Sequence, residues 1–222
     1  MKRNPEENTP NEITALLRAA ICWRHEGKME GMISLSTSPL ENPNCIARRN
    51  IKGSICEKCF SYTLNEYRDA LREKLLKNTV LLCEKEHPVH VWPLLNTLYF
   101  RLESFGDLIN TIQVRNYFNF CRRNPATTFA LWTKNPLVIR QALAEGAKKP
   151  RNLIVIFSSC MVNKQMDLEA VKRVFPFVDK IFTVYDKEHA GQVNINCGAN
   201  HCLSCLRCYK KRSENVINEK LK

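Results

Sequence analysis

The sequence predicts an α/β fold: a partial (β/α) barrel or an open parallel sheet of five to six strands, with a cysteine-rich metal-binding segment at the C-terminus. Short apolar runs alternate with amphipathic segments, and this order favours parallel strands joined by right-handed crossovers. The runs 129–132 and 152–157 are apolar on both faces, as buried parallel strands are. A closed barrel of eight such units needs a longer chain than 222 residues.

The individual strands are predicted from short runs rich in β-branched and aromatic residues. They are expected at Met32–Ser36, Thr97–Leu102, Thr127–Trp132, Leu153–Phe157 and Lys180–Val184, with a weaker sixth at Gln192–Ile195. Helices are predicted where apolar residues recur at helical spacing. They are expected at Ile13–Trp23, Leu64–Leu82, Leu108–Cys121, Pro136–Ala144 and Asp167–Val174. Asn135 and Asp167 are expected to be N-caps.

The chain is expected to form one domain with short additions at both ends. Residues 1–11 are polar and are predicted to be disordered, residues 12–196 form the α/β domain, and residues 197–222 form a cysteine-rich segment packed on it. No apolar run reaches the roughly 20 residues of a membrane-spanning helix. The first residues lack the apolar region of a secretory signal. The sequence therefore predicts a cytoplasmic protein without membrane association, whose thiols stay reduced.

Seven of the eleven cysteines lie in two short polar stretches. The first stretch contains Cys45, Cys56 and Cys59. The second has the spacing C-x4-C-x2-C-x2-C and contains Cys197, Cys202, Cys205 and Cys208. Grouped thiolates in a reducing compartment are typical of metal ligands rather than disulfides. We predict all seven as metal ligands and expect the sheet to bring the two groups together.

The identity of the metal is predicted from the cysteine spacing. Three thiolates spaced as closely as Cys202, Cys205 and Cys208 favour an iron–sulfur cluster, in particular 4Fe–4S. Cys56 and Cys59 also form a zinc knuckle, so zinc is the alternative. Seven thiols are compatible with one shared centre or with two.

The net charge of +12 bears on both the metal and the partners. Much of the excess lies in the two cysteine stretches, whose basic residues include Arg48, Lys58, Arg207 and Lys211. Positive charge lowers the pKa of nearby thiols and offsets the charge of a thiolate–metal centre. A basic surface is also typical of proteins that bind nucleic acids. A zinc-stabilised nucleic-acid-binding protein is therefore the alternative function.

Polar side chains follow the ends of the predicted strands, where parallel α/β proteins bind ligands. The candidate catalytic residues there are Arg101, Glu103, Asp107 and Lys134. Strand alternation places Arg101 and Glu103 on one face, where a buried pair must neutralise itself or meet a ligand. Helix caps and turns also use such polar residues. The candidate cofactor-binding residues are Ser36, Ser38, Asn135, Ser158 and Ser159.

These motifs resemble a family typed on a phage gene product numbered 88. That family pairs a Cys-Pro…Cys…Cys-Tyr segment with an Arg…Gly-Asp strand and a C-terminal cysteine group. The similarity covers about residues 30–210 and rests on Asn44-Cys45, Cys56–Phe60, Phe100-Arg101, Gly106-Asp107, Trp132–Asn135 and Cys202–Tyr209. Here Asn44 stands before Cys45, and two residues instead of three separate Cys56 from Cys59. The resemblance implies the fold and a metal site more than a reaction.

A looser resemblance is to radical S-adenosylmethionine enzymes, which are similar partial (β/α) barrels with a three-cysteine cluster loop after the first strand. Cys45, Cys56 and Cys59 occupy that position, with spacing C-x10-C-x2-C in place of C-x3-C-x2-C. The resemblance implies a cluster with an iron open to S-adenosylmethionine, whose polar ends would meet Glu103, Lys134 and the Ser158-Ser159 edge. An iron–sulfur enzyme acting at the strand carboxyl ends is thus the leading prediction. Neither its substrate, a small molecule or a nucleic acid, nor its oligomeric state is predicted.

Overall fold

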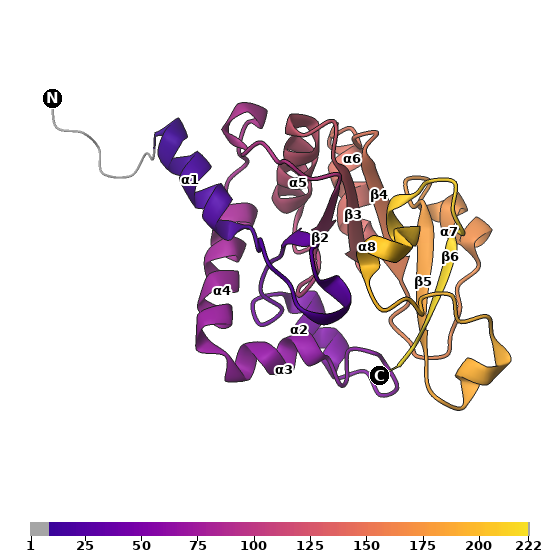
Figure 1. Cartoon of the computed structure of the whole chain (residues 1–222). Helices are drawn as coiled ribbons and strands as arrows, with labels where there is room; N and C mark the ends of the chain where they lie inside the picture. Colours follow the sequence, from indigo (N-terminus) through magenta and orange to yellow (C-terminus); the bar gives the residue numbers. More distant parts are fainter. Residues whose placement is uncertain (1–8, 222) are drawn as a thin grey trace, which may run out of the picture.

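The computed structural model describes residues 9–221, which contain one sheet of six parallel strands (Figure 1). The strands stand side by side in sequence order, from β1 to β6. Their bounds are Ile33–Leu35 (β1), Tyr99–Leu102 (β2), Thr128–Thr133 (β3), Leu153–Ser158 (β4), Lys180–Tyr185 (β5) and Val216–Lys220 (β6). The sheet is open, and the predicted α/β class with a parallel sheet is confirmed.

Five of the predicted strands are confirmed to within two residues at each end, but the predicted sixth strand is wrong. The range 192–195 contains the end of a 3₁₀ turn, and the sixth strand is β6, inside the segment expected to be appended to the domain. Although its sequence is polar, β6 forms backbone hydrogen bonds along both of its edges. Strand β5 pairs with one edge, and the N–H groups of Asn196 and Cys197 donate to Asn218 O on the other at 3.1 and 2.9 Å.

The helices mostly follow the predicted pattern, and helix α2 was not predicted. They are α1 (Pro10–Ala20), α2 (Pro43–Arg49), α3 (Phe60–Tyr67), α4 (Asp69–Cys83), α5 (Thr111–Arg123), α6 (Pro136–Ala144), α7 (Leu168–Val174) and α8 (Cys202–Cys205). Four 3₁₀ turns join them: η1 (Gly27–Met29), η2 (Val89–Val91), η3 (His189–Gln192) and η4 (Arg207–Tyr209). Within residues 9–221, no helix combines the length and apolar composition needed to cross a bilayer.

Local backbone chemistry explains where several helices begin and end. Thr9 and Glu12 form a reciprocal cap on α1, so residues 10 and 11 are helical rather than disordered. Residues 1–8 lie outside the described part of the chain. The helix predicted over 64–82 is divided into α3 and α4, because Arg68 is extended, with φ −118° and ψ 91°. Asp167 caps α7 as predicted, whereas the Asn135 side chain makes no cap bond to α6.

One face of the sheet is covered by α1, α4, α5, α6 and α7, which enclose the main apolar core. Aromatic rings stand at its centre: Phe120 lies 4.8 Å from Trp92 and 5.2 Å from both Phe100 and Phe129, measured between ring centroids. All four side chains are buried. We call this the helix face of the sheet.

The opposite face is covered by the cysteine-rich connection from β5 to β6, and we call it the cysteine face. Tyr209 of η4 packs there with Met32, Ala130, Ile154 and Ile156. In Figure 1, α8 stands in front of the sheet while α5 and α6 lie behind it. This last crossover therefore has the opposite hand from the crossovers through α5, α6 and α7. Right-handed connections, which the sequence pattern favours throughout, are not kept at this point.

The return of this unusual crossover into β6 is anchored by a buried lysine, Lys180 of β5. Its ammonium donates to the Ser213 hydroxyl at 3.0 Å and to Glu214 O at 2.9 Å. The Lys180 side chain is fully buried, whereas Ser213 is partly buried and Glu214 is exposed, so Lys180 ties this turn to the sheet from the inside.

Replacing Lys180 tests this anchor. Lys180→Met should lower the free energy of unfolding by about 1–3 kcal/mol, because the hydrogen bonds of the ammonium group are lost. It should also speed tryptic cleavage at Lys210–Arg212, measured by mass spectrometry. The matched control is Lys172→Met, since Lys172 makes only a partly exposed pair with Glu169. Equal cleavage rates in the two variants would contradict the anchoring role.

Candidate metal centre at the strand carboxyl ends

Backbone hydrogen bonds hold the loop after β1 against the end of β4. Ile55 N donates to Cys160 O at 2.8 Å, which places Cys56 beside Cys160. A turn in which Cys59 N donates to Cys56 O at 3.2 Å keeps Cys59 close to both. Cys160 is not among the predicted ligands. With Cys45, Cys56 and Cys59 it forms a set of four thiols that we call the carboxyl-end group.

Cys45 reaches this group from the short helix α2. The helix is capped by Asn42, whose Oδ1 accepts from Asn44 N at 2.9 Å and from Cys45 N at 3.4 Å. The Nδ2 of the same side chain donates to Asp107 O at 2.8 Å. Asn42 is completely buried, so one amide both starts the helix and fixes it to the loop after β2.

The buried carboxylate of Asp107 joins the loop after β2 to the end of β3 and to α2. Its Oδ1 accepts from the Thr133 hydroxyl at 2.6 Å, and its Oδ2 accepts from Lys134 N at 3.0 Å. Arg48 of α2 donates to Oδ2 at 3.2 Å and to Lys134 O at 2.8 Å. Asp107 is predicted as a catalytic residue. In the structure its lone pairs are used by these donors, so it positions the site.

The thiols of the carboxyl-end group lie close enough to influence one another's ionisation. Burial, opposed by Lys134 and reinforced by charge on Cys160 and Cys59, raises the pKa of Cys56 to about 11. Burial also raises the pKa of Cys45, and charge on Asp107, Cys56 and Cys59 acts in the same direction. Lys134 lowers the pKa of both thiols. Its ammonium therefore lies where it would stabilise thiolates.

The other predicted ligands, Cys197, Cys202, Cys205 and Cys208, form a separate set that we call the tail group. It lies on the cysteine face, where Lys28 donates to Cys197 Sγ at 3.3 Å. For the described thiols, burial raises the pKa most, and the charges that act next belong to the same group or to its own neighbours. No thiol of one group is a main influence on the described thiols of the other, and the meeting of the two groups in one site stays a prediction.

No metal arrangement is preformed in either group. Within residues 9–221, no set of three or more His, Cys, Asp or Glu side chains is arranged so that it could hold a metal ion. All eleven cysteines are free thiols. Within the described residues, the structure thus gathers thiols into two groups without arranging their side chains around a metal position.

Arg101 and Glu103 do not share a face, contrary to the strand alternation. Strand β2 ends at Leu102, and Glu103 has a left-handed backbone with φ 55°. This conformation turns its carboxyl group toward α5. Arg101 points to the cysteine face, with its guanidinium carbon 4.1 Å from the centroid of the Trp132 ring. The two predicted catalytic residues therefore belong to different environments.

Glu103 is the centre of a buried polar cluster on the helix side. It accepts from Thr37 Oγ1 at 3.1 Å, from Gln113 Nε2 at 2.7 Å and from the hydroxyl of Tyr117. Burial raises its pKa to about 8, although the hydrogen bonds from Tyr117 and Thr37 act in the opposite direction. Gly106 closes over this cluster: a Cβ there would stand 2.6 Å from Thr37 O and 2.7 Å from Glu103 Oε2.

The predicted cofactor-binding residues are all buried, and most are used in turns. Ser36 Oγ bonds to Ser104, and Ser38 Oγ accepts from Leu40 N. Asn135 Nδ2 donates to Leu108 O, and Ser159 Oγ donates to Met161 O and Lys164 O. Ser158 is buried at the end of β4, beside these turns. These side chains shape the carboxyl-end loops rather than face an open site.

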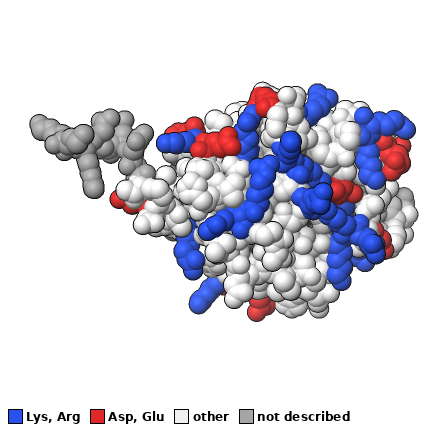
Figure 2. All heavy atoms as spheres, turned by 90° about the horizontal axis from the view of Figure 1, so that it is seen from above, with Lys and Arg blue, Asp and Glu red and all other residues white. Residues whose placement is uncertain are grey.

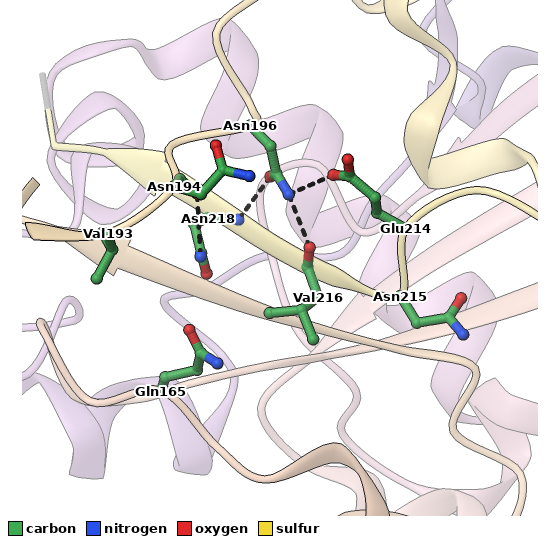
Figure 3. A pocket seen from close by; sticks show the side chains of 8 residues that line it. All are labelled: Gln165, Val193, Asn194, Asn196, Glu214, Asn215, Val216 and Asn218. Carbon is green, nitrogen blue, oxygen red and sulfur yellow. Dashed lines mark hydrogen bonds between the residues drawn. The ribbon is translucent and has the colours of Figure 1, made fainter.

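Two surface features lie away from the carboxyl-end group. A hollow beside β6 is lined mainly by amide side chains, and Figure 3 shows Asn194, Asn196 and Asn218 hydrogen-bonded around that strand. Lys and Arg crowd the face seen in Figure 2, at the amino ends of the strands. There Lys211 donates to Arg151 O at 2.5 Å, whereas Arg207 pairs with Glu214 at 3.2 Å.

The family model described as Gene product 88 matches residues 43–219, from α2 to β6. The chain belongs to this family. In this Gene product 88 family member, the residues that carry the resemblance lie beside one of the two thiol groups or in the loops that position them. They are Arg101, Gly106, Asp107 and Trp132–Asn135. Comparisons with curated proteins and with solved structures gave no match.

Three residues beside the two thiol groups of this Gene product 88 family member are not among the predicted site residues. Cys160 stands at the end of a predicted strand, and that position is the signal that separates it from the other isolated cysteines. Arg48 and Lys28 carry no such signal. Each contacts its site through tertiary packing, Arg48 on Asp107 and Lys28 on Cys197.

Removing the charge of Asp107 should loosen the carboxyl-end loops. Asp107→Asn removes the ion pair with Arg48 and replaces one acceptor oxygen by an NH2 group, which is a donor. We therefore expect the unfolding free energy, measured by urea titration, to fall by about 2–4 kcal/mol. The control is Asp69→Asn, whose side chain is 86% exposed and should change stability by less than about 0.5 kcal/mol. Indistinguishable midpoints would contradict the positioning role.

The raised pKa of Glu103 predicts a pH-dependent stability. The folded chain holds this proton up to about pH 8, whereas the ordinary pKa is 4.5, so ionisation opposes folding as the pH rises between these values. Wild type should lose stability relative to Glu103→Gln over that range, at most about 1.4 kcal/mol per pH unit. Glu188→Gln, at an exposed position, should track wild type. A constant difference between wild type and Glu103→Gln would contradict the shift.

Proposed function

We propose that this protein is an iron–sulfur enzyme whose cluster is held by the carboxyl-end group. The observation that carries the proposal is that thiols from two separate strand ends meet beside the ammonium of Lys134. Thiolates are the usual ligands of iron–sulfur clusters, and nearby cations offset their charge. Cys160 is the member that the fold, rather than the spacing, adds to the set.

The position of the group supports catalysis more than a structural staple. Parallel α/β proteins bind substrates at the carboxyl ends of their strands, and the group lies at the ends of β1 and β4. Hydrogen bonds that Asp107 accepts from Asn42, Arg48 and Lys134 already fix the loops that carry the thiols. A metal is therefore not needed there to hold the loops in place. A metal at the strand carboxyl ends fits a catalytic role better than a structural one.

Lys134 is the residue best placed to bind an anionic part of a substrate. Among the described residues, its ammonium forms no hydrogen bond or ion pair, while its backbone is fixed by Asp107 and Arg48. It is partly buried and faces Cys45 and Cys56. An ammonium held without a partner can pair with a carboxylate or phosphate next to the cluster.

S-adenosylmethionine is the cosubstrate that we propose. Two features that the looser resemblance implies support it, namely parallel strands in sequence order and a cysteine loop directly after β1, although the last crossover has the opposite hand. In that version Cys45, Cys56 and Cys59 would be the ligands, and Cys160 would lie beside the open iron. The carboxylate of S-adenosylmethionine would be the anion that pairs with Lys134.

The cluster itself is tested by iron and acid-labile sulfide analysis of protein purified without oxygen. Wild type should be brown, and Cys56→Ser and Cys59→Ser should each lose the iron of the carboxyl-end group. Cys22→Ser, outside both groups, is the matched control and should retain wild-type iron. A colourless protein with stoichiometric zinc, binding nucleic acid through its basic face more weakly as salt increases, would replace this proposal with the zinc alternative.

Cys160→Ser separates a fully ligated cluster from one with an open iron. If S-adenosylmethionine is the cosubstrate, this variant should keep its iron and still bind S-adenosylmethionine in a calorimetric titration, while Cys56→Ser should lose both. Loss of iron from Cys160→Ser, with no binding by wild type, would instead show four thiolate ligands and exclude that cosubstrate.

A further inference from the structure

The four thiols of the tail group are gathered by the fold at a second place on the sheet. Cys202 and Cys205 lie one helical turn apart in α8. Leu206 then takes a left-handed conformation with φ 50°, which reverses the chain so that η4 places Cys208 beside them. A left-handed Leu is unfavourable, so the surrounding packing must impose this turn.

The fourth thiol comes from a different segment. Cys197 N donates to Asn218 O of β6 at 2.9 Å, which fixes the cysteine beside the sheet edge. Lys28 of η1 donates to Cys197 Sγ at 3.3 Å, and α8, which carries Cys202 and Cys205, contacts η1. Cys197 thus lies beside the segment that carries the other three thiols.

Three cations from separate parts of the chain surround this group. Lys28 of η1 lies 3.3 Å from Cys197 Sγ and also pairs with Glu219 of β6 at 2.5 Å. Arg207 approaches Cys205 Sγ at 3.9 Å. Arg101 lowers the pKa of Cys202 and Cys208. Its Nε is buried and, among the described residues, has no hydrogen-bond partner, so it is available to a new acceptor.

An apolar wall shields the other side of the thiols. Cys202, Leu206 and Cys208 pack with Met32, Trp132 and Tyr209 on the cysteine face. Partial burial next to cations is the environment that stabilises thiolate-bound iron and slows its exposure to oxidants. Four free thiols without a shared role would not need partial burial together with three nearby cations.

We propose that the tail group holds a second iron–sulfur cluster, separate from the carboxyl-end group, with Lys28, Arg101 and Arg207 compensating its negative charge. This site does not depend on the proposed enzyme, because it shares no ligand with the carboxyl-end group. It also gives the Arg of the family motif a role: Arg101 is a positioning residue that stabilises the loaded cluster.

Iron and sulfide analysis of two complementary variants tests the proposal. Cys45→Ser/Cys56→Ser/Cys59→Ser should keep about half of the wild-type iron, held by the tail group. Cys202→Ser/Cys205→Ser/Cys208→Ser should lose the other half, and combining the two sets should remove all of it. If the tail variant keeps all wild-type iron, or if the tail group holds zinc, the proposal is overturned. If only the carboxyl-end variant loses iron, the second site is absent but the proposed enzyme stands. Failure of the second site is therefore distinguishable from failure of the proposed function.

A measurement on the wild-type chain covers variants that fail to fold. Mass spectrometry after iodoacetamide treatment should find the four tail cysteines protected in loaded protein and alkylated after iron chelation, with Cys22 equally reactive in both. Equal labelling of the tail cysteines before and after chelation would overturn the second site. Arg101→Met should release tail iron to a chelator at least several-fold faster than Arg101→Lys, and equal rates would remove the role given to Arg101.

Discussion

The carboxyl-end site depends on the buried carboxylate of Asp107. Through Thr133, Lys134 and Arg48 it ties the end of β3 and helix α2 to the loop after β2. Without an acceptor at this point, donors of Thr133, Lys134, Leu108 and Arg48 would each lose a hydrogen bond, which is costly. Asp107 therefore fixes the loops that carry Cys45 and Lys134.

The second constraint is the path of the chain between β5 and β6. Because this crossover passes over the cysteine face, η4 packs against Ala130 and Ile154, and α8 lies beside η1. A right-handed crossover would have placed the same cysteines among the helices of the opposite face. The crossover with the unusual hand is thus the segment that carries the tail group. Lys180 and Lys28 are the buried and partly buried cations that hold this path at its two sides.

Periodicity and alternation predicted the fold class and five strands, because these strands are apolar enough to show their pattern. They failed for β6, whose sequence is polar because it is an edge strand held by β5 and by residues 196–197. Spacing divided seven thiols into two groups, but it gave no information on which face each would occupy. Cys160 and the separation of Arg101 from Glu103 depend on tertiary pairing and on one positive φ angle. Neither leaves a periodic trace in the sequence.

The central claim is that the two thiol groups, which the fold places apart, each hold an iron–sulfur cluster. Its most direct test is the metal and acid-labile sulfide content of the wild-type chain purified without oxygen. The account predicts iron and sulfide in equal amounts, about eight of each per chain for two 4Fe–4S clusters. Stoichiometric zinc without sulfide would contradict it.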